Sequence, residues 1–288
     1  MDLRKISYFL AVAEHGGFTR ASEAVFASQP ALSLAVKKLE HELGVQLFHR
    51  IGHDVCLTPA GAALVGPARQ LQRDVETARA AVADVVGLRS GSLSLCSLPT
   101  LAANPLAELV GRFRKRHASV VVDLAAPETS DELLALIRSG ASEIGLTEHI
   151  ALPDELVAHD LLTQRLLIIF PPGTARRRPG ISMGELERIP FIAAPTGTSS
   201  RRLLDEAFSA AGVTPQIAVV TAQRDAILAL VLAGAGAALV PEPLAEEAVR
   251  LGATLARPHP AITRRVVLAH RRGPLAPAAQ RFLDEATS

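Results

Sequence analysis

The sequence predicts a multidomain α+β protein with a helical N-terminal unit, one long helix, and a larger C-terminal region of alternating strands and helices. Three observations predict this fold class. Short amphipathic helical patterns fill the first 58 residues, a heptad-like apolar pattern follows them, and strand-like and helix-like runs alternate from residue 91 onward. A chain of 288 residues, 49% of them apolar, is long enough for two or three folding units.

Composition excludes several classes of protein. The only cysteines, Cys56 and Cys96, lie far apart and form neither a disulfide framework nor a zinc-binding pattern. The N-terminus lacks the features of a signal peptide. The longest apolar run, Ala226 to Val240, is too short to span a membrane and contains Gly234 and Gly236. We therefore expect a cytoplasmic protein without a cofactor or a membrane partner.

Three helices are predicted in the N-terminal unit. Apolar spacing predicts the first over residues 3–13. The second is expected over Arg20–Phe26, with Thr19 as its N-cap, and the third between the N-cap Ser28 and the C-terminal Gly44. The third helix presents one narrow apolar stripe, made by Leu32, Ala35, Val36, Leu39 and Leu43.

Two short helices joined by a tight turn are typical of a helix-turn-helix. Opposite the apolar stripe, the third helix exposes Pro30, Ser33, Leu34, Lys37, Lys38 and His41, with Gln29 at the N-terminal end. Gln29 and Ser33 can hydrogen-bond base edges, the lysines can meet phosphates, and Leu34 can touch thymine methyl groups. The alternative is a three-helix bundle with an ordinary polar face. Charge does not decide between them, because six basic and six acidic residues balance over residues 1–58.

A small hairpin is predicted after the third helix. Apolar and polar residues alternate around Val45 and Leu47 and again around Val55 and Leu57. Between these two segments lies a turn that contains Gly52, His53 and Asp54. This pattern predicts a wing beside the third helix, from which Arg50 and His53 can contact the DNA backbone or minor groove.

These motifs together resemble one known family. The run FTRASEAVFASQPALSLAVKKLEHELGVQLFHR, followed by LTPAG, resembles the winged helix-turn-helix of the LysR-type transcriptional regulators. Leu34 departs from the family, which usually has a polar or basic residue there, and His53 and Cys56 stand where wing residues are commonly basic. The candidate DNA-binding residues are Thr19, Arg20, Ser28, Gln29, Pro30, Ser33, Leu34, Lys37, Lys38, Arg50 and His53.

A long helix is predicted from Pro59 to about Gly87, capped by Thr58, with a kink or loosening at Gly66-Pro67. Its apolar positions follow steps of four and three, as in a coiled coil: Leu64, Ala68, Leu71, Val75, Ala78, Val82 and Val85. Such a seam needs a partner, either a second subunit or the next domain of its own chain. The resemblance implies a subunit contact and a homodimer or homotetramer, so the candidate dimerisation residues are Leu64, Leu71, Val75, Ala78 and Val82.

The C-terminal region is predicted to be α/β with mostly parallel strands. The strand candidates are Leu93–Ser97, Val120–Leu124, Glu143–Thr147, Leu166–Phe170, Phe191–Ala193, Ile217–Thr221, Ala237–Val240 and Val266–His270. The helix candidates are Ala102–His117, Asp131–Ser139, Ser199–Ala211 and Arg224–Ala233. A break near Thr163–Gln164 and a return at Val266–His270 suggest two lobes that share a cleft. This arrangement resembles the periplasmic-binding-protein-like effector domain of the same family.

The predicted domains are therefore a winged helix-turn-helix over residues 1–58, a linker helix over 59–89, and an effector domain over 90–288. Lobe I is expected over about 91–162 and 267–288, and lobe II over about 163–266.

Hydroxyl-rich junctions between strands and helices mark the expected ligand site. Ligands of open α/β sheets bind beyond the carboxyl ends of strands, where helix N-termini favour anions. The candidate effector-binding residues are Ser97, Thr100, Thr129, Thr196, Gly197, Thr198, Ser199 and Gln223. Thr100 matches the Ser or Thr that the family commonly has after the first strand. For each hydroxyl the alternative role is that of a helix cap. Ser130 is expected to act only as a cap. Either Thr129 or Glu128 can occupy the effector-binding position in this segment, and Thr129 is the residue chosen.

No catalytic or metal-binding motif is recognisable, so we expect no enzyme activity. Cys96 lies among apolar neighbours and is expected to be a packed small residue. The prediction is a regulator that binds promoter DNA and responds to a small anionic effector, and a contact with RNA polymerase is compatible with it. The alternatives are a small-molecule-binding protein without DNA binding, and an α/β transferase or hydrolase with a helical appendage.

Overall fold

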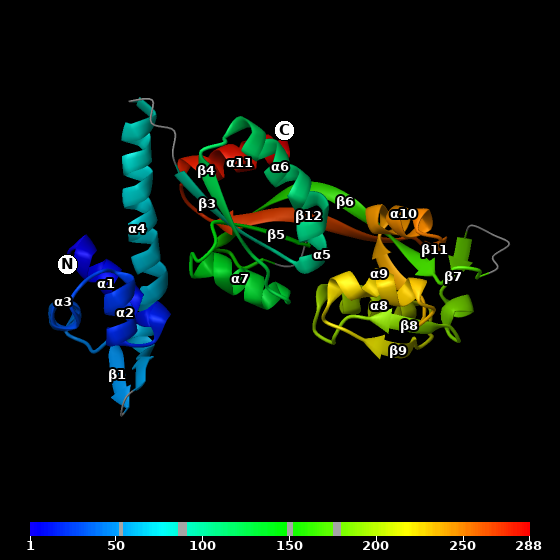
Figure 1. The fold of residues 1–288 in the computed structure, drawn as a ribbon, viewed down its shortest axis with the longest axis horizontal. Helices are drawn as coiled ribbons and strands as arrows, with labels where there is room; N and C mark the ends of the chain where they lie inside the picture. Colours follow the sequence, from blue (N-terminus) through cyan, green and yellow to red (C-terminus); the bar gives the residue numbers. More distant parts are fainter. Residues whose placement is uncertain (52–53, 86–90, 149–151, 175–179) are drawn as a thin grey trace.

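The computed structural model describes residues 1–51, 54–85, 91–148, 152–174 and 180–288. A helical unit with a small hairpin, one long helix, and a larger α/β region follow one another along the chain (Figure 1). His53 lies outside the described residues, as do the side chains of Arg50 and Val82, so the predictions for these three are not addressed by the structure.

The N-terminal unit is a winged helix-turn-helix. It contains α1 (Leu3–His15), α2 (Phe18–Ala24), α3 (Gln29–Leu43) and the antiparallel hairpin of β1 (Phe48–Ile51) and β2 (Asp54–Leu57). Phe9, Phe18 and Phe48 meet in its core, where the Phe48 ring centroid lies 5.4 Å from that of Phe9 and 5.9 Å from that of Phe18.

Local capping explains most of the helix boundaries. The Ser28 hydroxyl accepts a hydrogen bond from the Ala31 N–H at 3.4 Å, and Gly44 ends α3 with a φ of 69°, as predicted. The predicted Thr19 cap is wrong. Helix α2 begins at Phe18, after the N-cap Gly17, because Phe18 is drawn into the core, and Thr19 lies inside the first turn.

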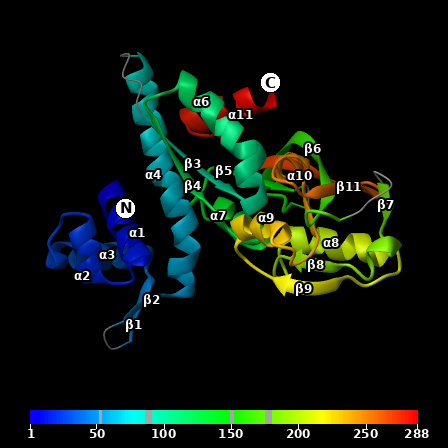
Figure 2. The same cartoon turned by 45° about the vertical axis from the view of Figure 1, so that its right-hand side comes forward.

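The long helix α4 (Pro59–Val85) begins as predicted, with the Thr58 hydroxyl accepting from the Gly61 N–H at 3.0 Å. Gly61 is required by close packing, since a Cβ there would lie 2.1 Å from the Leu47 carbonyl oxygen. The helix continues through Gly66-Pro67, where a kink or loosening is predicted, without a break in its helical structure. Figure 2 shows α4 running between the N-terminal unit and the α/β region. No helix in the described part of the chain is long and apolar enough to cross a bilayer.

One mixed sheet organises the α/β region. It contains β3 (Gly91–Ser97), β4 (Val120–Ala125), β5 (Ile144–Glu148), β6 (Leu156–Phe170), β7 (Gly180–Ser182), β10 (Ala238–Pro241), β11 (Thr254–His259) and β12 (Ile262–Arg271), in the order β4-β3-β5-β12-β6-β11-β7, with β10 also paired to β6. A parallel pair, β8 (Pro190–Ala193) and β9 (Gln216–Val220), is joined to it by a bridge between Phe191 and Ala237.

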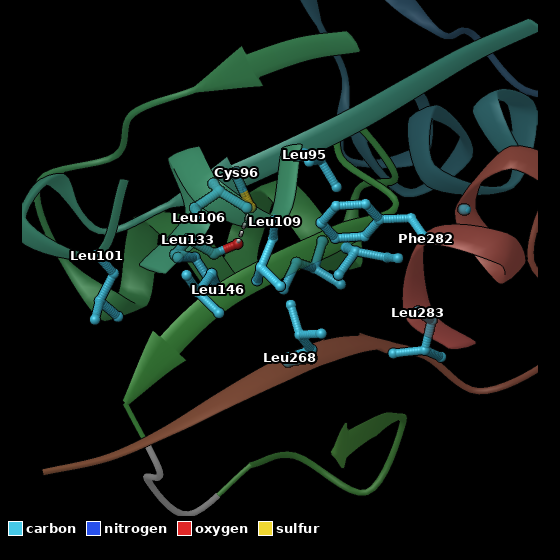
Figure 3. Close-up of a cluster of buried hydrophobic side chains, with 14 of the residues drawn as sticks. Leu95, Cys96, Leu101, Leu106, Leu109, Leu133, Leu146, Leu268, Phe282 and Leu283 are labelled. Atoms are coloured by element: carbon cyan, nitrogen blue, oxygen red, sulfur yellow. Dashed lines mark hydrogen bonds between the residues drawn. The ribbon is translucent and has the colours of Figure 1, made fainter. Parts of the chain in front are cut away.

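Two lobes share this sheet. Lobe I is built on the core that contains Leu95, Leu146 and Phe282 (Figure 3), and lobe II on two cores that contain Phe170 and Ile169. The antiparallel strands β6 and β12 run side by side through both lobes (Figure 1). The chain therefore crosses between lobes inside a strand rather than at the break expected near Thr163–Gln164, and β12 and β6 make the sheet less parallel than predicted.

The helices cover this sheet. They are α5 (Pro99–Leu101), the π-helical turn η1 (Ala102–Leu106), α6 (Ala107–Arg116), α7 (Ser130–Arg138), the 3-10 turn η2 (Gly184–Leu186), α8 (Ser199–Ala210), α9 (Arg224–Leu232), α10 (Glu242–Arg250) and α11 (Pro277–Thr287). The single helix expected over Ala102–His117 is interrupted, because Asn104 is extended before Pro105. Sequence reasoning missed α10, α11, β7 and β11, and β11 contains Pro258, a residue type that is uncommon inside strands.

Candidate nucleic-acid interface and effector cleft

Helix α3 presents the predicted outward face. Leu32, Val36 and Leu39 are buried against α1 and α2, although the last member of the predicted stripe, Leu43, is exposed. The opposite side leaves Gln29, Pro30, Leu34, Lys37 and Lys38 exposed, and Ser33 half-buried. Leu34 is 55% exposed, so an apolar side chain does stand in the middle of this polar face. The face therefore combines an amide, two cations and an aliphatic group, which suits a DNA major groove.

The first turn of α2 holds two further predicted DNA contacts. Thr19 and Arg20 are both exposed, and Arg20 Nη2 donates to the Gly16 carbonyl at 3.1 Å. Arg20 thus caps the C-terminal end of α1 and keeps the start of α2 in place. Ser28 is exposed, but its hydroxyl is used as the cap of α3.

The wing is fastened to α3 by one carboxylate. Glu40 Oε1 accepts from the backbone N–H of Leu47 at 2.8 Å and of Phe48 at 3.3 Å. Because Leu47 and Phe48 are buried, this carboxylate sets the position of β1 relative to the outward face of α3.

Phe26, in the turn between α2 and α3, combines a strained backbone with a solvated side chain. Its φ is 50° and its side chain is 98% exposed. A left-handed backbone costs a non-glycine residue about 1 kcal/mol, and asparagine tolerates it better. We expect Phe26→Asn to raise the free energy of unfolding by about 1 kcal/mol. Leu34→Ala, which removes an exposed apolar group from regular helix, is the control for exposure alone. If Phe26→Asn were less stable than the parent protein in thermal or urea unfolding, the Phe26 ring would have to make stabilising contacts, contrary to its exposure.

The linker helix is partly covered by its own chain. Ala68 is fully buried in the N-terminal core, and Leu64 and Leu71 pack against the same core. Val75 is half-buried and Ala78 is exposed. Leu64 and Leu71 therefore pack on the preceding N-terminal unit of their own chain, which is neither the second subunit nor the next domain expected as the partner of the seam. Of the seam residues whose side chains the structure describes, Val75 and Ala78 are the two that lie outside this core.

Three of the six predicted effector hydroxyls, those of Ser97, Thr129 and Thr198, have local roles. Thr129 caps α7 by accepting from the Glu132 N–H at 3.2 Å, so the expected assignment of Ser130 as the cap is wrong. Thr198 caps α8, and the Ser97 hydroxyl donates to the Leu98 carbonyl at 3.0 Å. Thr196, Gly197 and Gln223 are exposed, whereas Ser199 is buried and its hydroxyl has no hydrogen-bond partner among the described residues.

A small cavity of about 50 Å³ opens where the two lobes meet. Thr100 is the one predicted effector residue that lines it. Its other polar lining residues are Ser200, Arg224 and Arg264; the rest of the wall is apolar, from Leu166, Ile192, Ala193, Ala194, Leu204, Ile227, Leu239, Val240, Pro241 and Leu244.

Arg264 is a buried cation in the cavity wall, only 4% exposed. Its Nε and Nη2 donate to Gln164 Oε1 at 2.8 and 2.5 Å, and its Nη1 donates to Thr100 Oγ1 at 3.0 Å. Gln164 in turn donates to Asn104 Oδ1 at 3.2 Å. Burial lowers the pKa of Arg264 to about 10, and Glu148 opposes this shift, so Arg264 remains protonated at neutral pH.

Two ion pairs join the lobes beside this cavity. Arg202 in α8 pairs with Glu148 at the end of β5 at 2.5 Å, and Arg224 in α9 pairs with Glu128 before α7 at 3.1 Å. Several buried polar atoms around them meet no hydrogen-bond partner in the described part of the chain: Thr147 Oγ1, Glu148 Oε2, and Arg224 Nε and Nη1. Sequence reasoning named Glu128 only as the alternative to Thr129, and it missed Arg202, Glu148 and Arg224 because it looked for hydroxyls at the junctions between strands and helices. Arg224 directly follows Gln223, a predicted effector residue, so the sequence prediction came within one residue of it.

Both cysteines are free thiols in different surroundings. Cys96 is fully buried in lobe I, and burial raises the pKa of its thiol to about 11, whereas Cys56 is exposed in the wing. The thiolate is the reactive form, so Cys96 is inert at neutral pH. We expect a thiol reagent such as DTNB to modify one of the two cysteines in the native protein and both after unfolding. Rapid native modification of Cys96, read out by peptide mass, would contradict its burial.

Comparison with known proteins places both parts of the chain in one family. The model described as a bacterial regulatory helix-turn-helix protein of the lysR family matches residues 3–62, and that of the LysR substrate binding domain matches residues 87–288. The RuBisCO operon transcriptional regulator of Allochromatium vinosum is 29% identical over 243 residues, covering 83% of this chain and 79% of that protein. The transcriptional activator IlvY of Salmonella typhimurium is 28% identical over 250 residues, covering 85% and 84%.

Solved structures share the whole architecture. A full-length OxyR variant from Pseudomonas aeruginosa superposes with a TM-score of 0.78 at 20% identity and covers 100% of this chain and 93% of that one. CbnR in complex with its target DNA gives a TM-score of 0.66 at 22% identity, covering 99% of each chain. Members of the family are transcriptional regulators rather than enzymes. With a family model matched over residues 87–288, more than half of its length, the chain belongs to the LysR family of transcriptional regulators.

Proposed function

We propose that this regulator reads promoter DNA with the exposed face of α3 and the wing, and that a small anionic effector in the inter-lobe cleft controls it. The domains proposed for these roles are residues 1–58, 59–89 and 90–288. The DNA contacts are assigned to Gln29 and Ser33 at base edges, Lys37 and Lys38 at phosphates, and Leu34 at thymine methyl groups. Arg50 and His53 of the wing would contact the backbone or minor groove.

The observation that carries the effector assignment is the pair of arginines, Arg224 and Arg264, in a cavity wall that is otherwise apolar except for Thr100 and Ser200. Two buried cations attract a negative charge, and the apolar wall favours an organic body. Thr100 fits this role, because its oxygen accepts from Arg264 and its own O–H proton remains available to a carboxylate. The other predicted effector residues would act by shaping the adjoining loops and helix ends.

The assembly is proposed to be a homodimer, or a homotetramer made of two dimers, in the cytoplasm. Val75, Ala78 and Val82 would form the subunit contact of α4, with Leu64 and Leu71 holding α4 on the N-terminal unit. Two-fold pairing of subunits would place two α3 helices at the spacing of near-palindromic half-sites. A bound effector would act by binding more tightly to one relative placement of the DNA-reading helices than to another. A contact with RNA polymerase is compatible with this arrangement.

Thr100→Val tests the effector assignment. The substitution removes the O–H donor and leaves a donor of Arg264 unpaired, and hydrogen bonds to charged groups contribute about 1.5–3 kcal/mol. We expect a carboxylic acid that raises the thermal midpoint of the full-length protein to bind Thr100→Val about tenfold or more weakly. Thr100→Ser keeps the hydroxyl and is the matched control. DNA affinity should stay near that of the unmodified protein, and an equal loss of DNA binding and acid binding would contradict the assignment.

A further inference from the structure

Phe26 is the most exposed of the large apolar residues that the structure describes. Its side chain is 98% exposed, and the next in this set, Met1, is 64% exposed. Phe26 lies in the turn between α2 and α3, three residues before Gln29. Since hydrophobic stabilisation comes from surface removed from water, a ring left in water adds nothing to the core of the N-terminal unit.

The backbone of this turn does not call for a large side chain at Phe26. The Ala27 N–H donates to the Ser22 carbonyl at 3.0 Å, and the Phe26 N–H donates to the Glu23 carbonyl at 3.3 Å. These two bonds form a Schellman motif at the end of α2, and Phe26 occupies its left-handed position with a φ of 50°. Glycine is usual at that position and asparagine is tolerated, because a side chain disfavours this backbone conformation. A phenylalanine here therefore serves neither the core nor the turn.

The turn brings the ring close to the proposed DNA-reading face. Gln29 is the first residue of α3, and the N-terminal residues of a recognition helix contact base edges in the major groove. Three Cα–Cα steps of about 3.8 Å keep Phe26 within roughly 11 Å of Gln29. This distance corresponds to about three base-pair steps of 3.4 Å along the duplex axis. A duplex that Gln29 reads thus presents several base pairs near the ring.

An uncharged aromatic ring suits one of the groups that the major groove exposes. Phosphates favour cations, and the polar base edges favour hydrogen-bonding side chains, neither of which the ring provides. The thymine C5-methyl group is apolar, and phenylalanine is among the side chains that contact it. Leu34, which is 55% exposed on α3, is a second apolar group assigned to thymine methyl groups. Phe26 and Leu34 stand on opposite sides of Gln29 in the sequence.

We propose that Phe26 is a further specificity-determining residue of the DNA interface, and that its ring packs on a thymine methyl group close to the base pair that Gln29 reads. The proposal rests on the proposed DNA-reading role of α3 and adds a contact from the turn that precedes this helix. The apolar surface of the ring then leaves water only when DNA is bound, so the ring contributes to affinity rather than to folding.

The test compares two duplexes and two proteins. The full-length parent and Phe26→Ala are titrated by fluorescence anisotropy with duplex from upstream of the gene, and with the same duplex carrying deoxyuridine for thymidine, which lacks only the methyl groups. We expect Phe26→Ala to bind the thymidine duplex about five- to tenfold more weakly, with an unchanged salt slope because no charge is lost. On the deoxyuridine duplex, to which the parent itself binds more weakly, the two proteins should differ by less than about twofold.

Two further variants serve as controls. Phe26→Asn suits the left-handed backbone, so it should unfold at the same or a higher urea concentration than the parent and still lose affinity as Phe26→Ala does. Loss of folding is then excluded as the cause. Val121→Ala removes a 62% exposed apolar side chain from β4 in the effector domain and should leave affinity for both duplexes unchanged.

The opposing outcomes separate this contact from the proposed function. Equal affinity of parent and Phe26→Ala for the thymidine duplex would overturn the contact while leaving sequence reading by α3 in place. An equal loss on both duplexes would also overturn it, because the ring would then touch sugar and phosphate rather than a methyl group. A changed oligomeric state of Phe26→Ala in sedimentation would assign the ring to a protein contact instead. If the parent did not prefer the upstream duplex over a shuffled one, the proposed function would fail and this contact with it.

Discussion

Gln29→Ala is expected to reduce the preference of this protein for its operator over mismatched DNA by about 5- to 100-fold. Gln29 is exposed at the first position of α3, immediately after the cap Ser28, where a recognition helix enters the major groove. A bidentate contact from glutamine to adenine contributes about 1–3 kcal/mol of discrimination. Because Gln29 carries no charge, binding to nonspecific duplex should change little. The measurement is a pair of binding isotherms, on operator and on mismatched duplex, for each protein.

Lys37→Ala is the matched comparison on the same face. Lys37 is exposed two turns further along α3, where an ammonium group can meet phosphates but reads no sequence. We expect affinity to fall on all duplexes alike and the salt dependence to weaken by about one unit of slope. If both variants lost affinity uniformly, or both lost only discrimination, the division of roles between Gln29 and Lys37 would be wrong.

Glu40→Ala is expected to destabilise the N-terminal unit by about 2–4 kcal/mol and to loosen the wing. The Glu40 carboxylate accepts from two backbone N–H groups, those of Leu47 and Phe48, and both residues are buried. Alanine leaves these donors without an acceptor in apolar surroundings, where each unpaired group costs about 1–3 kcal/mol. Urea unfolding measures the loss, and hydrogen exchange at Leu47 and Phe48 measures the loosening.

Glu40→Gln is the control for this prediction. The amide oxygen of glutamine can still accept these hydrogen bonds, but it carries no charge. Glu40→Gln should therefore lower the free energy of unfolding less than Glu40→Ala does. Unchanged unfolding and unchanged exchange in Glu40→Ala would mean that the wing is held by its apolar contacts alone.

The N-terminal unit was predictable because its signals are local. Ser28, Gly44 and Thr58 each cap a helix within three residues of their own position, and the apolar stripe of α3 repeats at helical spacing. The error at Thr19 arose where tertiary packing overrode a local signal, since burial of Phe18 moved the start of α2. The interruption at Asn104, by contrast, has a local signal in the following Pro105, which the helical pattern over Ala102–His117 had outweighed.

The cleft was only partly predictable. Thr100 was found from its place after a strand, but its partner Arg264 lies 164 residues further along the chain. Arg224 and Glu128 are 96 residues apart, and nothing in the pattern of either segment indicates the other. Hydroxyls at strand ends were visible in the sequence, whereas the return of β12 beside β6 brings Arg264 to Gln164, and the approach of the two lobes brings Arg202 to Glu148 and Arg224 to Glu128.

The central claim is that the outward face of α3 reads DNA sequence. Its most direct test is fluorescence anisotropy of the full-length protein on duplex from upstream of its own gene and on a shuffled duplex of equal composition, between about 50 and 200 mM salt. We predict an affinity ratio of about 10³ or more in favour of the upstream duplex, lowered by Gln29→Ala. Equal affinity for the two duplexes at every salt concentration would contradict the account.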